Sequence, residues 1–297
     1  MFVDDREAWQ AIVAERGGPV VQDWDWGASR EARGQRVWRL TDDGGLALQA
    51  VDARWHGLPV AWAAGGPLLG PGGAPRDLGR RLRRMSCQLR RPLVLAPHGW
   101  GGPDRPSGCP GLPAGAYLPA TVVVDLSGGA DAVLHRLHGS WRNQYRSGER
   151  RCARLEVGHD AIALARVAAL FRLGSGGRAP DIGEPELRAL AQAFGSNLEL
   201  SVAHDKGEDG DVGAAVVLRG SAQALLLGLV TTPAGRGRNG ANLLVFEAMA
   251  GAATAGLGRF DLGGITGPDD GIAHFKLRTN GVVVENAAPF AALPVPW

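Results

Sequence analysis

The feature that most constrains this chain is an order of predicted elements that occurs twice. In each half a β-meander is followed by a loop, a helix and a strand, although the halves share too little identity to form a sequence repeat. Interleaved helices and strands predict an α/β fold, and the doubling predicts two such units. A length of 297 residues, 45% of them hydrophobic, is enough for a core in each unit.

In the N-terminal half, apolar spacing and turn residues locate the expected elements. The Gly and Pro content of residues 98–115 predicts a loop before the next strand. We expect helices over 6–16 and 75–91, and strands over 36–40, 46–51, 92–96 and 120–126.

In the C-terminal half, the same signals predict a second meander and a nearly all-apolar helix, joined by a glycine-rich turn over 231–241. A strand over 282–290 is expected to close the first unit. We expect helices over 130–150, 161–173 after an Asp160 cap, 186–194 and 241–255, and strands over 198–204, 212–219, 222–230 and 259–262.

The charge balance excludes a uniformly basic chain, but it allows local basic patches. There are 32 basic and 30 acidic residues, and because Lys206 and Lys276 are the only lysines, 32 − 2 = 30 are arginine. This bias is typical of a high-GC codon supply. The three cysteines form no CxxC pair, which argues against a disulfide framework and a zinc site. With no apolar span and no signal-peptide pattern, we expect a cytoplasmic protein without an integral membrane segment.

Three stretches, in order over nearly the whole chain, resemble the FemABX family of peptidyl and aminoacyl transferases. They are QDWDW at 22–26 followed by Arg30, SWRNQYR at 140–146, and a stretch from LLVFEA at 243 through FDLGGI to FK at 275–276. The Gly65-Gly66-Pro67 turn is also similar to one in that family. Two features depart from the family pattern: Arg30 stands where lysine is usual, and a long helical arm is missing.

The resemblance implies two tandem GNAT-like α/β domains with mixed sheets. The N-terminal domain, on the acceptor side, would comprise 1–126 plus 283–297, and the donor-side domain 127–282. The implied activity is an aminoacyltransferase that joins the amino acid of an aminoacyl-tRNA to a primary amine. The acceptor would be a nucleotide-linked peptidoglycan precursor, or a small peptide or amine of secondary metabolism. No metal or organic cofactor is expected, because the ester is already activated.

The resemblance also implies a catalytic role for Lys276, with Phe275 beside it. A compact ammonium can approach and stabilise the oxyanion of a tetrahedral intermediate more closely than a planar guanidinium. The alternative is a solvated lysine on a strand. Asp261 is expected either to orient or deprotonate the acceptor amine, or to cap the turn that follows it.

Three residues are implied to bind the acceptor: Arg30, Trp26 and Gly66. Arg30, expected on a turn, would hold a phosphate bidentately. The alternative is a surface arginine flanked by core tryptophans.

Two arginine clusters are candidate surfaces for an RNA backbone. Arg142, Arg146 and Arg150 recur every four residues on one helix face, where they would bind tRNA. The second cluster lies on the helix predicted over 75–91. The alternative for both is a solvated charged face.

Two other functions remain open on the same fold: a CoA-dependent N-acyltransferase and a non-catalytic RNA-binding protein. Residues 231–241 lie where a GNAT-like domain wraps pyrophosphate at a helix N-terminus. The usual glycine spacing is not met, because the third residue after Arg236 is Asn239 and the third after Arg238 is Ala241. Ordinary acetyl-CoA use is therefore disfavoured.

Overall fold

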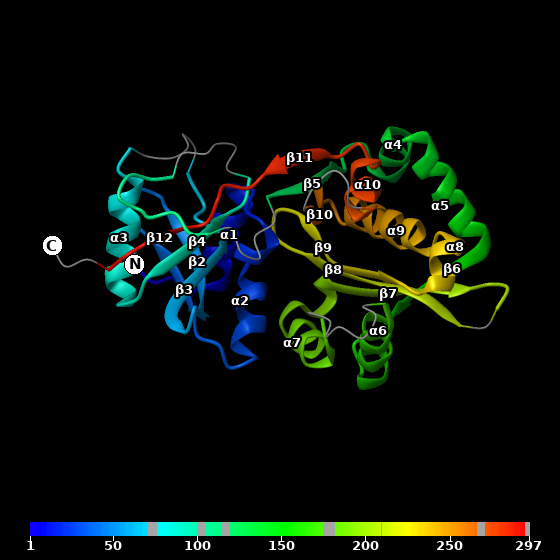
Figure 1. Cartoon of the computed structure of the whole chain (residues 1–297), viewed down its shortest axis with the longest axis horizontal. Coiled ribbons are helices and arrows are strands. Elements are labelled where there is room, and N and C mark those ends of the chain that lie inside the picture. The colour runs from blue at the N-terminus through cyan, green and yellow to red at the C-terminus, as the bar shows by residue number, and fades with distance from the viewer. Residues whose placement is uncertain are drawn as a thin grey trace. The chain divides into compact units, whose positions relative to one another are not determined.

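The computed structural model of the chain describes residues 1–70, 76–99, 105–113, 119–174, 182–208, 210–265 and 271–294. The chain divides into two compact units, Met1–Thr121 with Val284–Trp297, and Val122–Val283. Each unit has a mixed sheet with helices on both faces (Figure 1).

The first unit has the strand order β1-β2-β3-β4-β12. Neighbouring strands are antiparallel except β3 and β4, which are parallel. Its elements are α1 (Arg6–Glu15), the 3-10 helix η1 (Val20–Gln22), α2 (Trp24–Glu31), β1 (Val37–Thr41), β2 (Ala47–Trp55), β3 (Leu58–Gly65), α3 (Leu78–Leu89), β4 (Leu93–Pro97) and β12 (Phe290–Ala292).

The core of the first unit follows from the apolar seam of α3. Leu78, Leu82, Met85 and Leu89 recur at helical spacing and are buried against one face of the sheet. Each contributes roughly 1.5–3 kcal/mol when fully buried. Trp9 and Val13 of α1 pack with Ala47 and Leu68 in a second cluster.

The second unit has the strand order β11-β5-β10-β9-β8-β7-β6. Its elements are β5 (Ala120–Asp125), α4 (Gly129–Arg136), α5 (Gly139–Arg151), β6 (Cys152–Val157), α6 (Ala161–Gly174), α7 (Glu184–Phe194), η2 (Gly195–Asn197), β7 (Leu198–Asp205), β8 (Asp211–Arg219), β9 (Ala224–Thr231), α8 (Pro233–Arg238), α9 (Gly240–Thr254), β10 (Arg259–Ile265), α10 (Gly271–Leu277) and β11 (Val282–Glu285).

The apolar helix α9 lies between the sheet and the pair α4 and α5, which explains why it lacks a polar face. On the opposite face, α6 and α7 cover the sheet (Figure 1). There Gly228 of β9 lies so close to Phe171 and Ile182 that a Cβ would meet their side chains at 2.8 and 2.4 Å.

The helix predicted over 130–150 is wrong as one element, because the chain breaks between α4 and α5. Leu137 is extended, with φ −60° and ψ 148°. The His138 ring then accepts a hydrogen bond from Ser140 N and begins α5. The Asp160 cap of α6 is confirmed, because its carboxylate accepts from Ala163 N at 2.9 Å.

Three other predictions are corrected. Arg30 lies in α2 rather than on a turn, and the glycine-rich segment after β9 contains the short helix α8. The strand predicted over 282–290 is two strands: β11 joins the sheet of the second unit, and β12 pairs with β4 in the first. Within the described ranges, no helix is both long enough and apolar enough to span a bilayer.

Candidate active site

The sheet of the second unit is irregular where β9 and β10 run side by side. The two strands are parallel, with Phe260 opposite Ala224 and Asp261 opposite Leu225. Just beyond this register β9 has a bulge, because Leu226 faces Val217 while Gly228 faces Val216, which leaves Leu227 as an extra residue. Residues 227–231 are only half-buried, although β9 is an inner strand. Backbone and apolar side chains of a central strand are therefore accessible there.

On β10, the irregularity continues at two glycines. Gly263 has φ +78°, a left-handed conformation that favours glycine. The buried carboxylate of Asp261 accepts a hydrogen bond from Gly263 N at 2.7 Å. Asp261 therefore makes the contact that its capping alternative requires.

Lys276 reaches the same segment from α10. Its Nζ donates to Gly264 O at 2.8 Å and lies 3.5 Å from the position that a Cβ on Gly263 would take. The residue is on a helix and half-buried, so it is not the solvated strand lysine of the alternative interpretation. The structure thus brings Lys276 and Asp261 together on the two glycines of β10.

Phe275 anchors α10 against the start of α5. Its ring centroid lies 5.7 Å from that of Trp141, at an interplanar angle of 43°. Trp141 is fully buried, and its indole N–H has no hydrogen-bond partner among the residues that the structure describes. The sequence pattern did not single out this orphan donor one residue before Arg142, because an aromatic residue in a helix is typical of a core.

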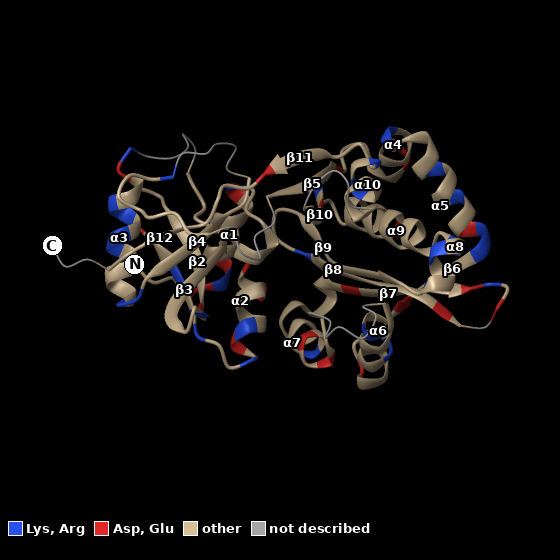
Figure 2. Ribbon diagram, in the orientation of Figure 1, with Lys and Arg blue, Asp and Glu red and all other residues tan. Residues whose placement is uncertain are grey.

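The three arginines proposed for tRNA lie on α5, but they differ in their contacts. Arg142 Nη1 donates to His135 O at 2.8 Å and Leu137 O at 2.7 Å, so its guanidinium bridges the break between α4 and α5. Arg146 and Arg150 are exposed. Basic residues are visible along α5 in Figure 2.

A polar cluster that the sequence analysis missed lies between α5 and α9. Tyr145 Oη is 2.9 Å from Oε1 of both Glu149 and Glu247. Burial and these two carboxylates raise the pKa of Tyr145 well above its ordinary value. The four-residue spacing of Tyr145 and Glu149 was a signal for half of this cluster, whereas Glu247 is distant in sequence.

Three backbone amides of the segment between β9 and α9 donate to acceptors within the same segment. Gly235 N donates to Thr232 Oγ1, Arg236 N to Thr232 O, and Asn239 N to Arg236 O. A Cβ on Gly235 would lie 1.9 Å from Val212 O, so α8 is pressed against β8. These amides are therefore not presented as a cradle for a pyrophosphate.

In the first unit, Arg30 and Trp26 form a pair on α2. The guanidinium carbon of Arg30 lies 4.4 Å from the centre of the Trp26 ring. Burial lowers the pKa of the Arg30 guanidinium. Both side chains are half-buried, so the pair presents a cation on an aromatic platform at the surface of this unit.

Gly66 belongs to a different local structure, built around Gln22. The Gln22 carboxamide donates to Gln49 O at 3.0 Å and Ala64 O at 2.6 Å, and accepts from Gln49 N at 2.7 Å. A Cβ on Gly66 would lie 3.1 Å from Gln22 Nε2. Gly66 thus lets the chain pass close to the buried Gln22 carboxamide, which links the backbones of β2 and β3.

A metal centre is not formed by the described residues, among which no three His, Cys, Asp or Glu side chains gather as ligands.

Comparisons with known proteins agree with this architecture. Residues 139–277 match the model of the acetyltransferase (GNAT) domain family. The structure is similar to FemX, with a TM-score of 0.76 at 11% identity over 98% of this chain and 96% of that one. A search of curated proteins found no match.

Two other solved structures are similar over nearly their whole length. One is a tandem GNAT protein from the clavulanic acid biosynthesis pathway, with a TM-score of 0.60 and 16% identity over 100% of this chain and 99% of that one. The other is the C-terminal domain of a protein assigned as a lysylphosphatidylglycerol synthetase from Agrobacterium fabrum. Its TM-score is 0.58 and its sequence identity 14%, over 97% of this chain and 91% of that one. The expected pair of GNAT-like folds with mixed sheets is confirmed, as is the resemblance to FemX at the level of the fold.

Proposed function

Because this chain has the FemX-like fold of two GNAT-like units, we propose that it is an aminoacyltransferase whose donor is an aminoacyl-tRNA. The nitrogen of a primary amine attacks the ester carbonyl carbon, an amide bond forms, and the ester C–O bond to the terminal ribose breaks. The proton that the amine loses ends on the ribose hydroxyl. The products are the amide and free tRNA.

The observation that carries this proposal is the position of Lys276 Nζ against Gly264 O, at the irregular end of β10. In transfer from an ester, negative charge develops on the carbonyl oxygen only as the tetrahedral carbon forms. An ammonium held nearby by α10 stabilises that charge without first having to reorganise. Asp261, on the same two glycines, fixes the backbone to which Lys276 is bonded.

The donor preference follows from α8. An acyl-CoA pyrophosphate needs several outward-pointing amides, whereas the amides of Gly235, Arg236 and Asn239 donate within the segment and Gly235 packs onto Val212 O. A tRNA instead needs cations spread over a surface. Arg146 and Arg150 are exposed on α5 and supply such cations, while Arg142 donates to Leu137 O at the N-terminal end of the helix.

We place the acceptor side in the first unit as part of this proposal. Arg30 on the Trp26 ring is a fixed guanidinium suited to a phosphate of a nucleotide-linked acceptor. Gly66 contributes there by allowing the close approach of the chain to Gln22. An acceptor without phosphate, such as a small peptide amine, would not use Arg30.

A CoA-dependent N-acyltransferase is the second candidate. It is supported by the match of residues 139–277 to the acetyltransferase (GNAT) domain and by the likeness to a tandem GNAT protein. The internal bonding of α8 counts against it.

The two candidates are separated by incubating the purified protein and an amine acceptor with charged tRNA or with acetyl-CoA. We expect transfer from charged tRNA. Transfer from acetyl-CoA alone would replace the proposal by the second candidate, and no reaction with either would favour a binding protein.

Lys276→Ala is the test of the site. We expect turnover to fall by about 10²–10³-fold, the typical effect of removing one oxyanion donor, while circular dichroism stays unchanged. Lys276→Arg should recover only part of the rate, because a planar guanidinium does not replace a point charge. Lys206→Ala is the matched control, since Lys206 donates to Glu149 O on another part of the unit. Full turnover in Lys276→Ala would exclude the catalytic role.

A further inference from the structure

The arginines around α3 are too concentrated to follow from composition. Residues 76–91 contain seven arginines and a single acidic residue, Asp77, whereas arginine makes up about one residue in ten of the whole chain. Sixteen residues of average composition would hold one or two. A codon bias therefore explains why these cations are arginine, but not why they are gathered here.

Some of these arginines are bound by the fold and others are not. Arg81 pairs with Asp42, and Arg91 with Asp52. The side chains of Arg80 and Arg84 are exposed and make no hydrogen bond or ion pair within the part of the chain that the structure describes. Four residues span about 6 Å along a helix, so Arg80 and Arg84 lie one turn apart on the same face. Like charges at this spacing destabilise the helix unless an anion lies over them.

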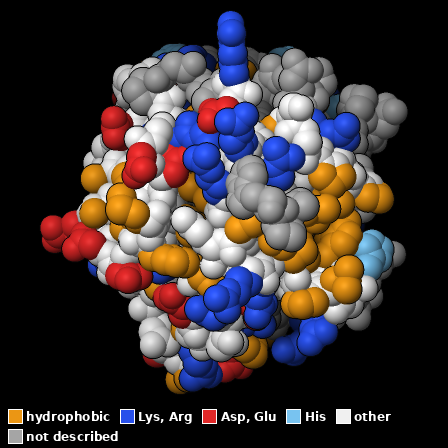
Figure 3. Space-filling view, turned by 90° about the vertical axis from the view of Figure 1, so that its left-hand side faces the viewer, with side chains coloured by type: hydrophobic (Ala, Val, Ile, Leu, Met, Phe, Trp, Pro, Cys, Tyr) orange, Lys and Arg blue, Asp and Glu red, His pale blue; other side chains and the backbone are white. Residues whose placement is uncertain are grey.

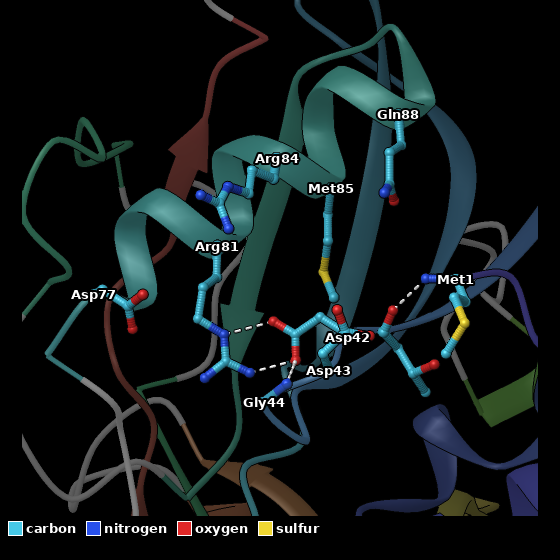
Figure 4. A pocket seen from close by; sticks show the side chains of 10 residues that line it. Met1, Asp42, Asp43, Gly44, Asp77, Arg81, Arg84, Met85 and Gln88 are labelled. Carbon is cyan, nitrogen blue, oxygen red and sulfur yellow. Dashed lines mark hydrogen bonds and ion pairs between the residues drawn. The ribbon is translucent and has the colours of Figure 1, made fainter.

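The surface beside this face is hollowed. A pocket of about 380 Å³ lies between α3 and the turn after β1. Figure 4 shows Arg81, Arg84 and Gln88 extending from α3 on one side, and Asp42 on the turn opposite. Arg81 can reach Asp42 because residue 44 is glycine, where a Cβ would lie 2.6 Å from Arg81 Nη2. Figure 3 views the molecule from the side on which α3 lies in Figure 1, and basic side chains gather near one another there.

The lining of the pocket is chemically mixed. Asp43 and Asp77 offer carboxylate acceptors, Gln88 offers an amide donor and acceptor, and the exposed side chain of Met1 adds apolar surface. A free anion alone does not match this set, because the carboxylates repel it. A nucleoside does match, since its hydroxyls and base amino groups donate while its ring packs on an apolar wall.

We propose that α3 and this pocket form an RNA-binding surface in the first unit, with phosphates along Arg80 and Arg84 and one nucleoside in the pocket. The inference rests on the proposed function in taking tRNA as the RNA. An anionic membrane is disfavoured, because the apolar residues of α3 are buried in the core and none is left to enter lipid.

The test measures binding of fluorescently labelled, deacylated tRNA by anisotropy, from about 0.05 to about 0.2 M salt. The variant is Arg80→Gln with Arg84→Gln in the full chain. Losing two phosphate contacts should flatten the slope of log K against log[salt] by about 1.4–1.8, which corresponds to about 25- to 60-fold weaker binding at 0.1 M. Arg80→Lys with Arg84→Lys should retain the slope of the unaltered protein.

The matched control removes two exposed arginines elsewhere, Arg172→Gln with Arg188→Gln, and should change neither quantity. Gln88→Ala tests the pocket and should weaken binding of single-stranded RNA several-fold at an unchanged salt slope. Equal binding by the α3 variant and the control would overturn the proposal. So would an α3-dependent loss seen only with vesicles of phosphatidylcholine and phosphatidylglycerol, which would assign the surface to lipid.

Failure of the proposed function gives a different result. If the protein binds deacylated tRNA through α3 but transfers no amino acid from charged tRNA, the RNA surface stands and the enzyme assignment falls. If it transfers amino acids while the α3 variant binds tRNA normally, only the RNA surface is overturned.

Discussion

At the scale of single residues, the side chains that belong to the family-like motifs make different kinds of contact in the structure. Lys276 extends to the backbone of Gly264 at the irregular end of a strand. Arg142 and Gln22 instead hold backbone groups of their own units. A motif therefore includes residues that stabilise the fold as well as candidate catalytic residues, and only their contacts in the structure distinguish the two kinds.

One residue-scale prediction concerns Asp211. Hydrogen bonds from Arg166 at 2.5 and 2.7 Å, which outweigh burial, hold the pKa of this carboxyl below its ordinary value. A carboxyl with a lowered pKa in the folded state adds stability above its unfolded pKa of about 3.9, and this stability is lost as pH falls through the folded pKa.

Urea unfolding of Asp211→Asn should therefore show a loss of about 1 kcal/mol at pH 7 that shrinks below about pH 4. Glu184→Gln is a control for an exposed ion pair, that with Arg188, and should show almost no loss. A loss in Asp211→Asn that is equal at both pH values would contradict the ion-pair explanation.

At the scale of elements, the break between α4 and α5 has a direct consequence for the arginine row. Arg142 bridges the break, whereas Arg146 and Arg150 are exposed one and two turns later. Arg142→Gln should lower the melting temperature, because two carbonyl partners lose their donor. Arg146→Gln with Arg150→Gln should leave the melting temperature within a degree or two and weaken tRNA binding with a flatter salt slope. Thermal scans and anisotropy on the same preparations check both, and a reversed pattern would refute this division of roles.

Elements with strong periodicity could be predicted, and those set by tertiary contacts could not. The apolar spacing in α3 and the runs in β5 and β9 are strong local signals. The break at Leu137 has no proline, and it depends on Arg142 folding back onto carbonyls. The strand β6 alternates apolar and charged residues over 153–157, but it begins directly after the last residue of α5, so no turn residue marks its start.

At the scale of the whole molecule, the two units should respond separately to core changes. Phe290 and Phe260 are both buried, Phe290 on β12 of the first unit and Phe260 on β10 of the second. Truncating either to alanine removes about 3–5 kcal/mol from its own unit. Calorimetry should show two transitions, with Phe290→Ala lowering one and Phe260→Ala lowering the other. A single transition shifted equally by both would contradict the division.

The candidate site could be predicted only in part, because its residues are joined by the fold. The order FDLGGI and then FK placed Asp261 and Lys276 near one another by resemblance. Nothing in the sequence pairs Trp141 with Phe275, or Glu247 with Tyr145, since these partners are more than one hundred residues apart. Their proximity depends on how α5, α9 and α10 pack.

The strand β12 also sets an order of events during synthesis. It pairs with β4, with Phe290 opposite Leu95, yet it follows the whole second unit along the chain. A ribosome releases β1 to β4 long before it releases β12, while the second unit becomes complete a few residues earlier. The unit that begins the chain is therefore the last to acquire its full sheet, and a nascent chain stalled before residue 290 would expose the edge of β4 to other strands.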